Sequence, residues 1–322
     1  MSWWQALLDA GAVPANAGKS DEPEASPPGE ADLVEGTEVL AHAVDDTNPR
    51  IPADVSFLNG IERWSVVAYD GVVQVVSAYI AAAVRRRSAR GELATTLERS
   101  RAFAIAPHEQ MSTPLRQALE DSAPDIERVD GDLVGQPARY LEMIDMTVRR
   151  ARAHLERELA EQSLNALGAN AWLVLDGLLS RSATVARHPR ALGVIKSHGA
   201  QFLEGRGLER ALTLPAGHRS SVFAVRGGHT RTEVYSWYLR LWPWEGNDLL
   251  YGLLRIEARA DAATVAQAPA LSAWLYAERA PLATPATRWD RLLYPLHHVE
   301  EYLKARAPRA VRTRSRLPVG HD

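Results

Sequence analysis

Residues 171–180 read AWLVLDGLLS, and this stretch is the strongest indication of the fold class. A short apolar run is followed at once by Asp176-Gly177, a pair that favours a turn. Such a run, bounded by turn residues, is typical of a strand that is buried on both faces. Residues 191–198, ALGVIKSH, repeat the pattern after a loop. Two interior strands of this kind predict an α/β fold with a mixed sheet flanked by helices.

More strands are predicted on either side of this centre. Residues 55–71, VSFLNGIERWSVVAYDG, contain two β-rich runs and close on Asp-Gly, a hairpin turn pair. Residues 72–84 are expected to begin as a strand and to pass into a helix. Further along the chain, segments 221–226, 233–242 and 250–258 predict an added antiparallel meander, because apolar and charged residues alternate in the last of them.

Helices are predicted where apolar residues recur every three or four positions. The longest covers about residues 138–166, and two more cover about 262–279 and 288–305. The apolar face of the long helix is formed by Leu141, Ile144, Val148, Leu155 and Leu159.

The two ends of the chain differ from this central part. A short helix is predicted within residues 1–13, followed by a disordered linker over 14–36 that is rich in Pro, Glu, Ser, Ala and Gly. Residues 37–305 form the predicted domain, and 306–322 form a basic tail. The N-terminal helix carries an apolar stripe of Trp3, Trp4, Leu7 and Leu8.

Composition excludes several classes of protein. The 322 residues include no cysteine, which removes disulfide scaffolds, thiol nucleophiles and Cys-ligated zinc. No apolar run approaches the ~20 residues that span a bilayer, and the first residues lack the features of a secretory signal, so a cytoplasmic location without membrane association is expected. The net charge is −3. Phosphate-loop, GxSxG and HExxH motifs are absent, so the chain is not expected to hydrolyse ATP by itself.

Polar residues follow the apolar strands at positions where α/β sheets place their ligands. Asp176 follows residues 172–175, and Asn59-Gly60 stands in the same relation to residues 55–58. A carboxylate in such a place needs a cation or hydrogen bonds to offset its desolvation. Both pairs are also common turn sequences, and that simpler interpretation is equally good for Asp176.

The long helix carries a glutamate and an arginine at the edge of its apolar face. Val148, Arg152, Glu156 and Leu159 share one side by spacing, so Glu156 rather than Glu158 is predicted to face inward. An ordinary Arg152–Glu156 pair on the surface is the competing interpretation, worth a few tenths of a kcal/mol.

Two further groups carry candidate chemistry. Lys196, one of only three lysines, and His198 end the second interior strand, where a compact cation suits a phosphate oxygen. A lysine that merely extends to solvent is the alternative. In the last helix, Asp290, Tyr294 and the pair His297-His298 recur at spacings that share one side, and they are candidates for a hard-metal site or for ordinary helix-end residues.

Taken in order, FLNGIERW, WLVLDGLLS, GVIKSH, YLRLW and LLYPLHHVEEYL resemble the NurA family, over roughly Val55 to Lys304. The resemblance implies an RNase H-like fold, related to the nuclease domain of Argonaute proteins. It also implies a Mn²⁺- or Mg²⁺-dependent nuclease that acts on DNA ends, in repair or phage defence. Such proteins are usually homodimers beneath a hexameric HerA/FtsK-type ATPase.

The family's site residues map onto the candidates above. By resemblance, Asn59, Glu156, Asp176, Asp290 and His297 would hold the metal, and Asp176, Glu156, Lys196 and Tyr294 would carry catalysis. The DNA-contacting set would be Lys196, His198 and Arg152. Carboxylates that converge from strands and a helix are what paired divalent ions require.

Asn59 departs from the family, which has aspartate there. A neutral amide is a weaker ligand than a carboxylate, so two hypotheses stand. The first is a metal-dependent nuclease, which could recruit Glu62 or Asp70 in place of the missing aspartate. The second is a catalytically silent subunit that binds DNA or scaffolds the ATPase ring. Either the N-terminal stripe or the meander near Trp242 and Trp244 is predicted to contact the ATPase or a second copy, with folding of the stripe onto its own domain as the alternative.

Overall fold

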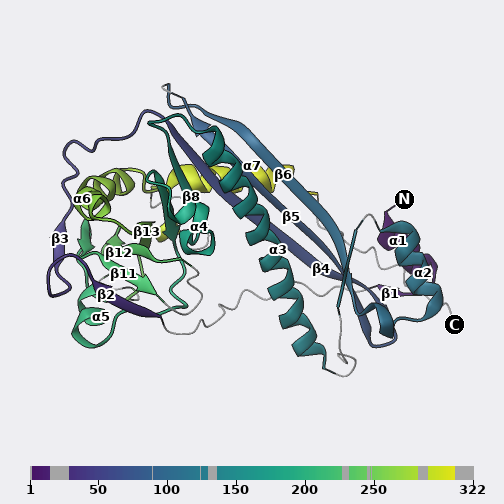
Figure 1. The fold of residues 1–322 in the computed structure, drawn as a ribbon. Helices are drawn as coiled ribbons and strands as arrows, with labels where there is room; N and C mark the ends of the chain where they lie inside the picture. The colour runs from purple at the N-terminus through teal and green to yellow at the C-terminus, as the bar shows by residue number, and fades with distance from the viewer. Residues whose placement is uncertain are drawn as a thin grey trace.

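The computed structural model describes residues 2–14, 29–88, 90–123, 125–129, 136–226, 232–244, 247, 249–281 and 289–308. Its centre is one large mixed sheet with helices on both faces, so the predicted α/β class is confirmed (Figure 1). Among the described residues, no helix is both long and apolar enough to cross a membrane.

The sheet is built around strands that run in both directions. Its main path is β2-β11-β12-β13-β9-β8-β4-β5-β6-β7, in which β4, β8 and β9 are parallel neighbours and β4, β5 and β6 are antiparallel. These central strands are β4 (Val55–Asp70), β5 (Val73–Arg87), β6 (Leu93–Ala106), β8 (Trp172–Asp176) and β9 (Ala191–Ile195).

The predicted meander is confirmed, with slightly shorter strands. The strands are β11 (Phe223–Arg226), β12 (Val234–Arg240) and β13 (Leu253–Arg259), and β13 pairs antiparallel with β9. Short strands complete the sheet: β1 (Val13–Pro14), β2 (Glu30–Leu33), β3 (Ala41–Ala43), β7 (Ile126–Arg128) and β10 (His218–Ser220).

Two helices cover opposite faces of the central strands. Figure 1 shows α3 (Pro137–Ala166) lying across β4, β5 and β6, with α7 (Tyr294–Arg306) on the other side. The alternation of β4 explains this, because Leu58 joins the core beneath α3 whereas Phe57 joins the core beneath α7. The remaining helices are α1 (Trp3–Asp9), α2 (Thr113–Ser122), α4 (Ala183–Ala186), α5 (Gly205–Leu212) and α6 (Ala262–Ala277).

One predicted element is wrong. Residues 72–84 do not pass into a helix, since β5 continues as a strand to Arg87. The run of small residues Ala81, Ala82 and Ala83 is fully buried between β4 and β6. Pairing with a neighbour on each side therefore overrides the helical propensity of alanine.

The N-terminal boundaries also need correction. Residues 30–33 of the predicted linker form β2 and pair with β11, so the linker is shorter than 14–36. Helix α1 packs on α2 at the far end of the long strands, with Leu7 fully buried beside Leu115 and Leu119 (Figure 1). Residues 15–28 of the linker and 309–322 of the basic tail lie outside the described residues.

Candidate functional site

The two polar strand residues lie side by side, but they do not both end a strand. Leu58 of β4 pairs with Leu175 of β8, which brings Asn59 next to Asp176. Asp176 is the last residue of β8, as predicted. Asn59 lies inside β4, because β5 pairs with β4 along its whole length and keeps that strand extended.

Asp176 is neutralised by Lys196. The two side chains form a close ion pair and are both largely buried. On α7, the pKa of Glu300 is lowered: burial alone would raise it, but hydrogen bonding by Lys304 and the charge of Lys196 outweigh that effect. Asp176, Lys196 and Glu300 therefore form one electrostatic group at the ends of β8 and β9.

Glu156 reaches this region from α3. A Cβ atom added at Gly60 would lie 2.4 Å from the Oε1 atom of Glu156, so the carboxylate occupies the space that a side chain would fill. Glu156 is only 15% exposed, whereas Glu158 is 43% exposed and pairs with Arg99 and His154. The helical spacing thus predicts correctly which glutamate faces inward.

Arginines on α3 balance the acidic groups around Glu156. The Nε atom of Arg152 lies 3.4 Å from Glu62 Oε2 and 3.8 Å from Glu156 Oε1. Arg149 lies 4.0 Å from Glu62. Burial raises the pKa of Glu156, the charge of Arg152 opposes that rise, and Asp176 and Glu62 add to it. Three carboxylates thus act on one another here, each beside a cation.

Asn59 is held by the backbone rather than presented to a ligand. It is 3% exposed. Its Oδ1 atom accepts a hydrogen bond from the Gly60 N–H at 2.8 Å, and its Nδ2 atom donates to the Leu296 carbonyl of α7 at 3.1 Å. The amide therefore bridges β4 to α7, and its oxygen already has a partner.

The residues predicted to bind metal do not fit a divalent ion as they are arranged. Within the described residues, no three His, Asp or Glu side chains are grouped closely enough to hold a metal. The Asn59 oxygen is engaged, and Asp176 and Glu156 are both beside cations. Mn²⁺ and Mg²⁺ need several oxygen ligands, including carboxylates whose negative charge is not already neutralised by a protein cation. The predicted ligands do not supply such carboxylates in this arrangement.

The predicted site residues in and before α7, namely Asp290, Tyr294 and His297, differ in their contacts and exposure. Asp290 accepts hydrogen bonds from the Gly252 N–H at 2.7 Å and from Arg291 at 3.1 Å, and so fastens the turn before β13. The Nδ1 atom of His297 is buried without a hydrogen-bond partner. Tyr294 is 53% exposed at the start of α7.

His198 does not suit the predicted role as a DNA-binding cation. Burial is the main cause that lowers its pKa to about 4, so the ring is neutral near pH 7. Its Nε2 atom donates to the Leu253 carbonyl at 2.9 Å. His198 therefore ties the segment after β9 to β13, while Lys196 and Arg152 remain the cations of the predicted set.

Two acidic residues of the cluster were not among the predicted site residues. Glu62 is predicted only as a possible replacement for Asn59, although its position two residues after Gly60 puts it on the same face of β4. Glu300 was missed, although it follows His297 by three helical positions. Asp70, the other suggested replacement, lies at the far end of β4 and accepts a hydrogen bond from the Ser112 N–H at 2.6 Å.

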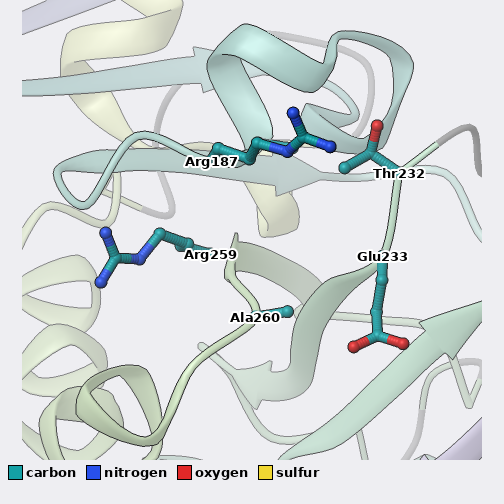
Figure 2. Close-up of a pocket in the computed structure, with 6 residues that line it drawn as sticks. Arg187, Thr232, Glu233, Arg259 and Ala260 are labelled. Atoms are coloured by element: carbon teal, nitrogen blue, oxygen red, sulfur yellow. The ribbon is translucent and has the colours of Figure 1, made fainter.

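A hollow elsewhere on the surface is unrelated to this cluster. Figure 2 shows Arg187, Thr232, Glu233, Arg259 and Ala260 around it. Arg259 pairs with Asp261, and Glu233 pairs with Arg226. Two charged residues of this hollow, Arg259 and Glu233, are therefore already in ion pairs with neighbouring side chains.

No family model matches the sequence, and a search of curated proteins finds no relative.

Proposed function

We propose that this chain is a NurA-like, DNA-binding subunit of RNase H-like fold that works with a HerA/FtsK-type ATPase and has little cleavage activity of its own. The mixed sheet, with antiparallel β4, β5 and β6 joined to parallel β8 and β9, supports the fold part of the proposal. The five ordered motifs support the family. In this proposal the chain acts as a homodimer around the DNA that the ATPase moves.

The observation that carries the proposal is the charge balance of the cluster. Asn59 contributes no charge, Lys196 neutralises Asp176, and Arg152 neutralises Glu156. Paired-metal hydrolysis needs carboxylates whose charge is free for the ions. A cluster compensated by its own cations has no free negative charge with which to assemble metals. Lys196 and Arg152 would contact phosphates only by exchanging Asp176 and Glu156 for them.

A metal-dependent nuclease is the second candidate, and one specific observation favours it. The Oε1 atom of Glu156 is buried without a hydrogen-bond partner, as is Nδ1 of His297. Buried polar atoms are normally satisfied, so these two are suitable contacts for a bound group. Cleavage would then require the Asp176–Lys196 pair to open.

The substitution Asn59→Asp separates the two candidates. The new carboxylate cannot donate to the Leu296 carbonyl, so we expect a loss of about 1–3 kcal/mol in unfolding free energy without metal. It also adds the missing negative charge, so Mn²⁺ should raise the melting temperature of the variant more than that of the wild type. Linear DNA should be cleaved by the variant with Mn²⁺ and only weakly, if at all, by the wild type.

The matched control is Asn59→Asp combined with Asp176→Asn, which should abolish the gained activity. Wild type and variants are incubated with linear DNA and Mn²⁺, with and without the ATPase, and DNA binding is measured in parallel. Efficient wild-type cleavage that is lost in Asp176→Asn alone would reject the silent subunit and establish the nuclease. Absence of any DNA binding would reject both candidates.

A further inference from the structure

One cation beside the cluster has no acidic partner. Arg181 is the last residue of the short 3₁₀ helix η2 (Leu179–Arg181), which follows Asp176 closely in the chain, and it is exposed. Its charge acts on Glu156, so it lies near the carboxylates of the cluster. Within the part of the chain that the structure describes, its guanidinium group forms no ion pair and no hydrogen bond.

The other cations of the cluster are already engaged. Lys196 pairs with Asp176, and Arg152 pairs with Glu62 and Glu156. The remaining cations nearby also have acidic partners: Arg149 with Asp145, Lys304 with Glu300, and Arg291 with Asp290. If Lys196 or Arg152 turned to a phosphate, a largely buried carboxylate would lose its counter-charge, which is costly. A phosphate that approaches from solvent can pair with Arg181 without that cost.

The segment that carries Arg181 is fixed on both sides of it. Ser180 donates its backbone N–H to the Glu257 carboxylate at 3.2 Å, and the Ser182 hydroxyl donates to Glu161 of α3 at 2.6 Å. Both serines are buried. These contacts hold the backbone of Arg181 in place, so binding an anion would restrict its side chain but would not require a loop to become ordered.

The turn before η2 keeps Arg181 at the end of the sheet where Asp176 lies. Gly177 has a φ of 141°, which favours glycine, and its N–H donates to the Val194 carbonyl at 2.9 Å. A Cβ atom added at Gly193 would lie 2.5 Å from the Gly177 carbonyl oxygen, so the chain turns tightly over β9. Arg181 therefore stays beside the carboxyl ends of β8 and β9, the edge at which α/β sheets bind their ligands.

We propose that Arg181 is a phosphate-contacting residue of this site, and that its guanidinium group pairs with a backbone phosphate of the bound DNA while Lys196 and Arg152 stay with their carboxylates. The inference rests on the proposed DNA-binding function and names the residue that holds the phosphate. A guanidinium group can donate two parallel hydrogen bonds to phosphate oxygens. A contact of this kind carries no preference for a base sequence.

Arg181→Ala tests the contact in the full chain, with a fluorescent linear DNA duplex as the probe. We expect the affinity to fall about threefold to tenfold, the loss of one charge-assisted contact. Arg187→Ala is the matched control, because Arg187 is also exposed but lines the separate hollow of Figure 2. It removes the same charge from the same part of the chain and should bind DNA like the wild type.

Salt dependence distinguishes a phosphate contact from a structural role. Each phosphate contact contributes about −0.9 to the slope of log affinity against log salt concentration, so Arg181→Ala should make that slope shallower by about 0.9. Arg181→Lys keeps the charge and should keep the slope. Without DNA, the melting temperatures of these variants should lie within about 2 °C of the wild type, because an exposed side chain without partners adds little stability.

Equal affinities and equal salt slopes for Arg181→Ala and Arg187→Ala would overturn this assignment and leave the proposed function intact. Normal DNA binding by Arg181→Ala together with weaker binding of the ATPase would also overturn it, because the guanidinium group would then contact an acidic protein surface. A wild type that binds no DNA would instead reject the proposed function, and the assignment with it.

Discussion

At the scale of single residues, two partly buried glutamates have pKa values that their surroundings shift in opposite directions. Burial raises the pKa of Glu156 despite the charge of Arg152. For Glu35 burial also acts to raise the pKa, but the two hydrogen bonds from Arg219, both 2.7 Å, and one from the Val222 N–H lower it overall. The two carboxylates should therefore make opposite contributions to stability as pH changes.

Glu156→Gln and Glu35→Gln test this difference. The folded protein holds the Glu156 proton more tightly than the unfolded chain does, so wild-type stability falls as pH rises through and above the ordinary carboxyl pKa of about 4.3. Glu156→Gln should therefore gain stability relative to the wild type between pH 4 and 8. Glu35→Gln should lose it over the same range, because the Glu35 contribution is present above the ordinary pKa and disappears as pH falls.

Urea unfolding at a series of pH values measures both effects. If the free energy of unfolding varies with pH in the same way for Glu156→Gln and the wild type, the charged form of Glu156 is not destabilised by its surroundings. That result would contradict the raised pKa of Glu156 described above.

At the scale of elements, α1 shows how an apolar stripe on a short helix finds its partner. Leu7 is fully buried in a small core with Met111, Leu115 and Leu119 at the distal end of the long strands. Trp3, Trp4 and Leu8 pack against the same core. The helix thus folds onto its own domain, so in the proposed complex the region near Trp242 and Trp244 remains as the predicted partner surface.

Leu7→Ala should destabilise this end of the molecule by about 2–4 kcal/mol, because it leaves a cavity between α1 and α2. Hydrogen exchange of the α2 amides measures the effect. Val72→Ala is the control, since Val72 is 69% exposed at the turn between β4 and β5 and should change stability by less than about 0.5 kcal/mol. Unchanged exchange in Leu7→Ala, with weaker ATPase binding, would indicate that α1 serves a partner instead.

At the scale of the whole molecule, the two faces of the sheet share the same strands. Leu173 of β8 belongs to the core beneath α3, and Leu192 of β9 belongs to the core beneath α6 and α7. Both side chains are fully buried. Strands β8 and β9 pair directly, with Val174 opposite Leu192, so neither core can open without disturbing the other.

Leu173→Ala and Leu192→Ala should each lower the free energy of unfolding by about 2–5 kcal/mol, within one shared transition. Circular dichroism at a helical wavelength and tryptophan fluorescence, followed during denaturation, should coincide for the wild type and both variants. Separate transitions for the two probes in either variant would contradict a single cooperative sheet.

Features of this protein that depend on local pattern can be predicted from its sequence alone. The apolar runs before Asp176 and Lys196 identified β8 and β9, and helical spacing identified α3 and selected Glu156 over Glu158. The spacing of apolar residues is a property of neighbouring positions in the chain, so these elements can be predicted without knowing which strands they pair with.

Features that depend on distant partners become visible only in the folded chain. The alanines of β5 form a strand because β4 and β6 flank them, and residues 30–33 form β2 because β11 offers a free edge. The charge balance of the site could not be predicted from the sequence either, because Lys196 pairs with Asp176 from a neighbouring strand. The Asn59 amide donates a hydrogen bond to the carbonyl of Leu296, 237 residues away. Contacts of such long range leave no periodic trace along the chain, and here they decide which polar groups are free to bind a ligand.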